Sequence, residues 1–275
     1  MKVGILHPGD MGSSVGGNLV TAGHRVFWVA QGRSQATAQR AERDGMEALE
    51  TLGELSAEVD IMLSICPPHG AVELATSVME TGFSGIFVDA NAVAPDTVRL
   101  IASRVGAGVD FVDGGIVGPP ARRAGSTRLY LCGGRAQEVA ALFGGTLLQA
   151  HCIEGDPGAA SALKMCYAAW TKGSAALLIA IAALARREGV DSALLEEWHL
   201  SQPDIPRKLQ GALRSSTAKA WRFQGEMQEI AATFHGQAMP DGFHLAAAEI
   251  FRRLSGVADE YQEDDEAILQ LLTAD

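Results

Sequence analysis

Short apolar runs and helix-spaced patterns alternate along the first half of the chain. The apolar runs predict strands, each closed by Gly, Pro or a polar turn, at Val3–Leu6, His24–Ala30, near Met46, Asp60–Cys66, Gly85–Asn91, Val109–Asp113, Thr127–Cys132 and Thr146–Ala150. Helical spacing predicts helices between them, at Met11–Val20, Gln35–Arg43, Ala71–Glu80 and Pro95–Val105. Strands that alternate with helices in this way are typical of an α/β fold with a doubly wound, mainly parallel sheet.

The pattern changes after residue 154. From Gly158 to Arg187 the chain is Ala-rich and apolar, and only Gly173 interrupts it, which predicts one long helix. Further helices are expected at Ser192–His199, Ile205–Ala218, Gly225–Phe234, Leu245–Arg253 and Asp259–Leu272. We therefore predict an N-terminal Rossmann domain over residues 1–154 and an all-α domain for substrate binding and dimerisation over residues 155–275.

A glycine turn connects the first strand to the first helix. In G-x-G-x-x-G, the dinucleotide fingerprint, Gly9 and Gly12 are the second and third glycines, while His7 replaces the first. The N–H groups at the helix start would hold a pyrophosphate. The predicted cofactor contacts here are His7, Pro8, Gly9, Asp10, Met11 and Gly12, with Pro8 expected to stabilise the turn. An ordinary strand-turn-helix unit would show the same pattern.

The end of the second strand predicts which nucleotide binds. An NAD-binding unit carries an acidic residue there, whereas Ala30–Ser34 contains none. Arg33 can pair with a 2′-phosphate, and we expect Gln31 and Ser34 to line the same place. The alternative is that Arg33 belongs to a solvated loop. The sequence therefore favours NADP(H) as the cofactor.

Further polar turns follow the later strands. Ligands of doubly wound sheets lie beyond the carboxyl ends of the strands, so Cys66, Pro67, Pro68 and Asn91 are expected beside the cofactor. Asp89 and Asn91 could equally be helix-entry caps. Residues 114–126 are predicted to form a long Gly/Pro loop, in which the adjacent Arg122 and Arg123 either meet an anionic substrate or lie on a solvated face.

Composition narrows the class of protein. With 275 residues and 47% apolar residues the chain can bury a large core, and its formal net charge of -11 argues against nucleic acid or an anionic membrane surface as partner. The longest apolar run, Ser174–Ala185, is too short to span a bilayer. No secretory signal precedes the first strand, and the four cysteines form no C-x-x-C pair, so we expect reduced core thiols, a cytoplasmic protein and no metal site.

Lys164 is the candidate catalytic residue. It stands in the long apolar helix among mostly small helix-face neighbours, Ala160, Ser161, Tyr167 and Ala168. A lysine in such surroundings can act as a general acid/base on a substrate hydroxyl or carbonyl during hydride transfer. A structural lysine that extends to solvent is the alternative.

These features in this order resemble the β-hydroxyacid dehydrogenases, the family of 3-hydroxyisobutyrate and 6-phosphogluconate dehydrogenases. The glycine turn with Met11-Gly12, the Pro-rich turn, the Gly loop near residue 115 and the Lys164 helix carry the resemblance over residues 1–185. Residues 113–120 and 221–253 resemble a branch with a small 6-phosphogluconate-dehydrogenase-like helical domain at the C-terminus. The resemblance implies that Lys164 is the catalytic acid/base.

The substrate residues depart from the family pattern. The substrate-binding Ser-Gly-Gly is replaced around Val117-Gly118-Pro119, Ala168 stands in place of an Asn, and Gly225-Glu226 aligns with a Lys-Asp pair. Arg222 can supply a positive charge one turn before Glu226, and His235 is a weaker candidate. The substrate contacts that the resemblance implies are Gly115, Ile116, Val117, Gly118, Tyr167, Arg222 and Glu226.

We therefore expect an NADP(H)-dependent oxidoreductase that interconverts a secondary alcohol and a carbonyl on a small polar, β-hydroxyacid-like substrate. The alternatives are an imine or ketone reductase, although imine-reducing relatives usually lack the lysine, and a non-catalytic NADP-binding protein. A homodimer is expected, with Ser174–Ala185 packed across the interface, unless this helix is buried inside one subunit.

Overall fold

The computed structural model describes residues 1–217, 219–255, 268–270 and 272, and these fall into two compact units. The first unit is Met1–Met165 and the second is Cys166–Asp275. The long helix α7 (Ala159–Arg187) begins in the first unit and continues into the second. The two units therefore meet inside this helix, after Met165. The sequence predicted the domain boundary earlier, after residue 154.

The first unit contains one eight-stranded sheet in the order β3-β2-β1-β4-β5-β6-β7-β8. All neighbours pair in parallel except β6 and β7, which are antiparallel. The strand order reverses between β1 and β4, the switch point at which doubly wound sheets bind ligands. The strands are β1 (Lys2–Ile5), β2 (Arg25–Val29), β3 (Glu47–Leu49), β4 (Ile61–Ser64), β5 (Ile86–Asp89), β6 (Asp110–Val117), β7 (Thr127–Cys132) and β8 (Leu148–Cys152).

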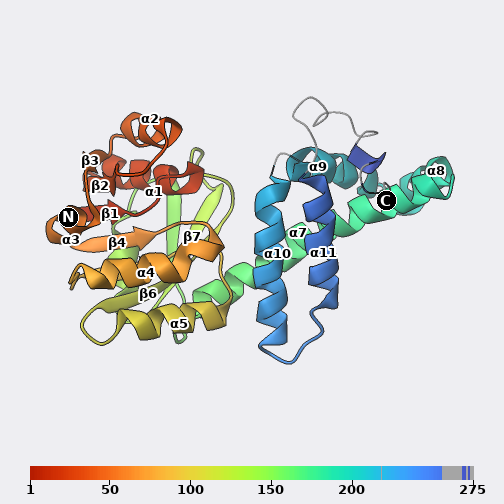
Figure 1. Cartoon of the computed structure of the whole chain (residues 1–275). Coiled ribbons are helices and arrows are strands. Elements are labelled where there is room, and N and C mark those ends of the chain that lie inside the picture. The colour runs from red at the N-terminus through yellow and green to blue at the C-terminus, as the bar shows by residue number, and fades with distance from the viewer. Residues whose placement is uncertain (218, 256–267, 271, 273–275) are drawn as a thin grey trace. The chain divides into compact units, whose positions relative to one another are not determined.

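Helices cover both faces of this sheet because its strands are apolar on both faces. Within β4, Ile61 and Leu63 join one core while Met62 joins the other. The first core is packed by α1 (Asp10–Thr21), α2 (Gln35–Arg43) and α6 (Ala136–Ala141), and the second by α3 (Leu52–Glu58), α4 (Ala71–Glu80) and α5 (Pro95–Val105). Figure 1 shows α4 and α5 side by side in front of the sheet. This arrangement confirms the predicted Rossmann fold.

Two local expectations for the first unit were wrong or incomplete. Residues 114–117 form the end of β6 rather than a loop, so the connection to β7 is only residues 118–126. The helical spacing also does not predict α3 and α6, which are short helices of 7 and 6 residues. β6 contains two glycines because neighbouring elements approach it so closely at Gly114 and Gly115 that a side chain there would collide with them.

The second unit is helical throughout its described part. After α7 come α8 (Asp191–Ser201), α9 (Ile205–Thr217), α10 (Ala220–His235) and α11 (Gly242–Leu254), and α10 and α11 lie side by side (Figure 1). This confirms the all-α C-terminal region. Most of the helix predicted at Asp259–Leu272 lies outside the described residues.

The apolar part of α7 extends beyond Ser174–Ala185, so the expectation that it is too short to span a bilayer was wrong. By length and composition alone this helix could cross a membrane, and 39% of its most apolar window is buried inside the protein. Core helices of soluble proteins pass the same test, so a single such helix is weak support for a membrane span.

Candidate functional site

The turn between β1 and α1 has the geometry of an anion-binding site. Gly9 is the N-cap of α1, its N–H donates to the His7 carbonyl at 2.9 Å, and its own carbonyl accepts from the Ser13 N–H at 2.8 Å. A Cβ on Gly12 would clash with the His7 carbonyl oxygen, so only glycine lets the helix start this close to the turn. The first N–H groups of α1 have no carbonyl partner within the helix, which leaves them available to a phosphate.

His7 fits the first fingerprint position without backbone strain. Among the described non-glycine residues only Ala238 has a positive φ, so the turn does not demand a glycine at residue 7. The side chain is half-buried, and burial together with the charges of Arg33 and Arg40 lowers the pKa of the imidazole. His7 is therefore neutral at physiological pH.

Two arginines lie against this turn. Arg33 hydrogen-bonds through Nη1 to His7 Nδ1 at 2.8 Å and donates from Nη2 to the Leu6 carbonyl at 3.1 Å. Arg40, which the sequence analysis did not select, donates from Nε to the Pro8 carbonyl at 3.5 Å and lies 3.6 Å from the Asp10 carboxylate. Arg40 is thus a second arginine against the turn, and it shares its charge with the Asp10 carboxylate.

Ser34 has a structural role in the same region. It is the N-cap of α2, and its hydroxyl oxygen accepts from the Thr37 N–H at 3.3 Å. The Thr37 hydroxyl in turn accepts from Arg40 Nη2 at 3.2 Å. Gln31 is exposed beyond the end of β2. Direct contacts from Gln31 and Ser34 to a cofactor remain predictions.

A cavity of about 450 Å³ opens beside Arg33. His7 and Arg33 form one part of its wall, and the turn after β4 together with the start of α4 forms the rest, through Cys66, Pro67, His69, Gly70, Glu73, Leu74 and Ser77. Burial raises the pKa of the Cys66 thiol to about 11. Cys66 is therefore a neutral wall residue rather than a reactive thiolate.

Asn91 connects the turns after β4 and β5. Its side-chain oxygen accepts from the Cys66 N–H at 2.6 Å, and its amide nitrogen donates to the Ser64 hydroxyl at 2.9 Å. Neither Asp89 nor Asn91 caps the following helix, since the N-cap of α5 is Ala94. Asn91 is 2% exposed, so the structure shows it as a buried residue that joins the two turns, and a direct cofactor contact remains a prediction.

A buried polar row crosses the carboxyl edge of the sheet. Ser64, Asp89, Asp113 and Cys132 are register partners on β4, β5, β6 and β7, and all four are fully buried. Burial raises the pKa of Asp89 to about 7, and the charge of Asp113 adds to the effect. Within the described structure Asp89 Oδ2 has no hydrogen-bond partner, which leaves this carboxyl costly to ionise.

Asp113 fastens the start of α7 to β6. Its carboxylate accepts from the N–H groups of Gly158, Ala160 and Ser161 at 2.8, 2.9 and 3.2 Å, and from the Ser161 hydroxyl at 2.7 Å. A carboxylate that receives the first N–H groups of a helix also interacts favourably with the helix dipole. This contact was not predicted from the sequence, because it joins segments far apart in the chain.

Lys164 stands one turn beyond that anchor. A Cβ on Gly115 would lie 2.5 Å from the Ala160 carbonyl oxygen and 3.1 Å from Lys164 Cβ, so the glycine lets α7 pack directly on β6. Asp113 pairs with Asp89, the last residue of β5, which means that Gly115 lies beyond the carboxyl end of β5. The structure therefore places half-buried Lys164 at the carboxyl edge of the sheet.

The other residues of the predicted Gly loop differ in their positions. Ile116 and Val117 are buried strand residues, 6% and 5% exposed, so a substrate could reach only their backbone. Gly118 has φ +116, and a Cβ there would clash with the Ser126 carbonyl oxygen. Arg122 forms an ion pair with Asp44 at 2.7 Å, which makes it a structural residue of the connection rather than a free cation.

The remaining candidates belong to the second unit. Tyr167 is 48% exposed on α7. On α10, Arg222 Nε lies 3.0 Å from Glu226 Oε1, and the buried Glu226 also pairs with Lys172 Nζ of α7 at 2.6 Å. Lys172 was not predicted, although it follows Lys164 by two helical turns. Their contact with a substrate remains a prediction.

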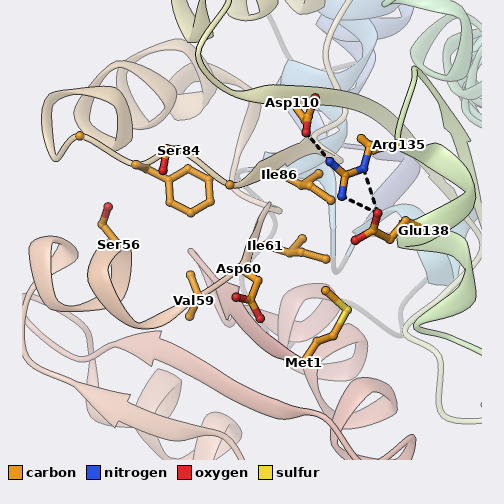
Figure 2. Close-up of a pocket in the computed structure, with 13 residues that line it drawn as sticks. Met1, Ser56, Val59, Asp60, Ile61, Ser84, Ile86, Asp110, Arg135 and Glu138 are labelled. Atoms are coloured by element: carbon orange, nitrogen blue, oxygen red, sulfur yellow. Dashed lines mark hydrogen bonds and ion pairs between the residues drawn. The ribbon is translucent and has the colours of Figure 1, made fainter.

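A second hollow, of about 350 Å³, lies at the opposite edge of the sheet. Figure 2 shows Arg135 between Asp110 and Glu138 on one side of it, and the ion-pair distances are 2.5 Å in both cases. Asp60 and Ile61 at the start of β4 contribute to its wall. The hollow is thus at the amino ends of the strands, away from the glycine turn.

The four cysteines lie at different depths in the protein. Cys132 is buried, Cys66 and Cys152 are half-buried, and Cys166 is exposed. All four are free thiols in the structure.

Residues 2–145 match the NAD-binding domain of 6-phosphogluconate dehydrogenase, which is more than half of the chain. The chain belongs to this family. A second match, over residues 185–254, is to a domain of unknown function, DUF1932. Together they confirm a nucleotide-binding N-terminal domain followed by a distinct helical region.

Individual relatives support the same conclusion. The chain is 26% identical over 196 residues to an uncharacterised 28.5 kDa protein of Methanothermus fervidus, covering 71% of this chain and 75% of that protein. It is 24% identical over 147 residues to the mitochondrial 3-hydroxyisobutyrate dehydrogenase of Drosophila melanogaster, covering 51% and 44%.

Solved structures agree over the whole chain. A conserved protein of unknown function, described as structurally similar to 3-hydroxyacid dehydrogenases, aligns with a TM-score of 0.72 at 26% identity over 98% of this chain and 99% of its own. The 3-hydroxyisobutyrate dehydrogenase of Mycobacterium tuberculosis, solved with L-serine, aligns with a TM-score of 0.71 at 18% identity over 99% of each chain. The second likeness concerns the fold alone. The resemblance to the β-hydroxyacid dehydrogenases is therefore confirmed at the level of fold and domain order.

Proposed function

We propose that this family member is an NADP(H)-dependent oxidoreductase that interconverts a secondary alcohol and a carbonyl on a small β-hydroxyacid-like substrate, with Lys164 as the general acid/base. The observation that carries the proposal is the position of Lys164. Asp113 anchors the first turn of α7, and Gly115 admits the helix against β6 beyond the end of β5.

The residues at the carboxyl edge fit the cofactor. The N–H groups at the start of α1 suit a pyrophosphate, and Gly12 leaves no side chain between turn and helix. Arg33 and Arg40 supply positive charge where the 2′-phosphate distinguishes NADP(H) from NAD(H), and Ala30–Ser34 contains no acid that would repel it. The cavity beside Arg33 provides room for the adenosine end.

The bound cofactor would accept or donate the hydride, and a protein side chain must accept or donate the proton. In the oxidation direction the substrate C–H bond breaks with transfer of a hydride, and the Lys164 amine takes the hydroxyl proton as the C=O bond forms. In the reverse direction Lys164 returns that proton to the oxygen.

The test is a comparison of Lys164→Met with the wild type and with Lys208→Met, a matched change at an exposed lysine of α9. The substrates, each with NADP, are 3-hydroxyisobutyrate, which the similar dehydrogenases are named for, and L-serine, with which one of them was solved. We expect Lys164→Met to lower kcat/KM by about a hundredfold or more and to leave NADPH binding within about twofold. NADPH binding without turnover of any hydroxyacid, ketone or imine would instead indicate a non-catalytic protein. Reduction of imines that is independent of Lys164 would indicate an imine reductase.

We also propose a homodimer formed through α7. Trp170, Leu177 and Leu184 are 74%, 46% and 60% exposed and follow one another at intervals of one heptad, so they form one apolar stripe. Sedimentation of the wild type and of Leu177→Glu tests this, because a charge in the stripe should dissociate the dimer. Wild-type protein that is only monomeric at micromolar concentration would contradict the proposal.

A further inference from the structure

We propose that His7 determines the preference for NADP(H) over NAD(H), by holding the Arg33 guanidinium in the orientation that receives the 2′-phosphate. This inference rests on the proposed function, since it assumes that Arg33 meets that phosphate. It gives a role to the residue that departs from the glycine fingerprint. His7 acts through Arg33 and is therefore a positioning residue.

The contact geometry fixes Arg33 at two points. One terminal nitrogen bonds to His7 Nδ1 at 2.8 Å and the other donates to the Leu6 carbonyl at 3.1 Å, so the planar group is held against the turn. A guanidinium has five N–H donors, and these two bonds leave the others for a ligand. Glycine at residue 7 would leave only the bond to the Leu6 carbonyl.

The partners of Arg33 also preserve its charge. Both are neutral, and in the described part of the chain no carboxylate forms an ion pair with Arg33. The imidazole can accept at Nδ1 only when it is unprotonated there, and burial beside Arg33 and Arg40 lowers the pKa of His7. Of the other charged groups nearby, Asp10 pairs with Arg40, while Glu73 and His69 line the cavity. The full positive charge of Arg33 is thus available to an anion.

Preorganisation is the physical reason for an effect on affinity. An arginine without its tether must lose side-chain freedom when the phosphate binds, whereas Arg33 has already lost it in the free protein. NADH has no 2′-phosphate and gains nothing from this arrangement. Loss of the tether should therefore weaken NADPH binding while leaving NADH binding unchanged.

The experiment titrates NADPH and NADH into the full-length wild type, His7→Leu, His7→Asn, Arg33→Ala and the His7→Leu/Arg33→Ala double variant, and follows cofactor fluorescence. Leucine removes the acceptor at similar volume, and asparagine can place an oxygen near the position of Nδ1. We expect His7→Leu to lower the NADPH/NADH affinity ratio by about five- to tenfold, and His7→Asn to restore most of it. In the Arg33→Ala background, His7→Leu should have no further effect, because the two residues act as a unit.

The outcomes separate this inference from the proposed function. An unchanged ratio in His7→Leu, or a loss that adds fully to that of Arg33→Ala, would overturn the role of His7 while NADP(H) specificity stands. A wild type that binds both cofactors equally would overturn the NADP(H) assignment itself. Thermal unfolding of each variant shows whether it is folded. If His7→Leu does not fold, His7→Asn replaces it in the comparison. A folded His7→Asn whose NADPH/NADH affinity ratio is as low as that of Arg33→Ala also contradicts the inference.

Discussion

Two arginines at opposite edges of one sheet show how partners decide the role of a charge. At the amino edge, Arg135 is neutralised by Asp110 and Glu138 (Figure 2). At the carboxyl edge, Arg33 is held by an imidazole nitrogen and a backbone carbonyl, both neutral. The carboxylates neutralise the charge of Arg135 inside the protein. The neutral partners of Arg33 fix its side chain without neutralising its charge, which can therefore attract an anionic ligand.

The acids of β6 repeat this contrast within four residues. Asp110 forms its ion pair at the exposed amino edge, with a side chain 53% exposed. Asp113 is fully buried and receives the N–H groups that begin α7. Exposed pairs contribute little to stability because solvent screens them, while buried donors that lose their acceptor are costly.

The largest expected effect is that of Asp113→Ala compared with Asp110→Ala. Removing Asp113 leaves the buried N–H groups of Gly158, Ala160 and Ser161 without their acceptor, so we expect the free energy of unfolding to fall by about 3–5 kcal/mol. Asp110→Ala should cost less than about 1 kcal/mol. Denaturant unfolding of both variants measures the difference, and equal losses would refute the distinction between the two edges.

The next effect concerns Asp89 and depends on pH. Its folded pKa of about 7 lies above the ordinary 3.8, so between these pH values the folded protein keeps a proton that the unfolded chain has lost. Stability of the wild type therefore falls as pH rises through this window, by at most about 4 kcal/mol, and the loss is complete above pH 7. Asp89→Asn should show a flatter profile of unfolding midpoint between pH 4.5 and 8.5. Parallel profiles for the two proteins would count against the raised pKa.

A smaller effect is expected on cofactor binding. Arg33→Ala should weaken NADPH binding by about ten- to a hundredfold, or about 1.4–2.7 kcal/mol, and leave NADH binding unchanged. Arg135→Ala is the matched control at the other edge and should change neither affinity. Fluorescence titration measures both. If the two variants behave alike toward NADPH, the contrast between the edges does not extend to ligand binding.

The smallest effect is expected at Arg40. Its guanidinium shares its charge with Asp10 at 3.6 Å, so Arg40→Ala should weaken NADPH binding by only about threefold. Arg43, on the same helix and paired with Asp44, provides the control and should have no effect. A loss at Arg40 as large as that at Arg33 would show that neutral partners are not what makes Arg33 effective.

The regular elements of the fold could be predicted because their signals are local. The bounds of α2, α4, α5 and β7 agree with the expectations, since Pro, Gly and apolar periodicity mark them in the sequence. α6 was omitted because its six residues are too few to show a helical period. Residues 114–117 were assigned to a loop because glycine is usually a turn residue, whereas here Gly115 serves the approach of α7.

The candidate site was predictable only in part, for a similar reason. The glycine turn, Arg33 and Lys164 stand out because their residue types are unusual in their own segments. The contacts of Arg40 with Pro8, of Asp113 with the start of α7 and of Lys172 with Glu226 join residues remote in sequence. A single sequence contains no local pattern that reports such a pair, so these contacts required the folded structure.

The side chain of Asn18 links α1 to segments synthesised much later. Its amide nitrogen donates to the carbonyls of Ser14 and Ala121, and its oxygen accepts from the N–H groups of Leu147 and Leu148. On the ribosome, α1 can form early, but its buried amide is fully bonded only when Leu148 has emerged. The native packing of α1 is therefore completed only after nearly the whole sheet has been translated.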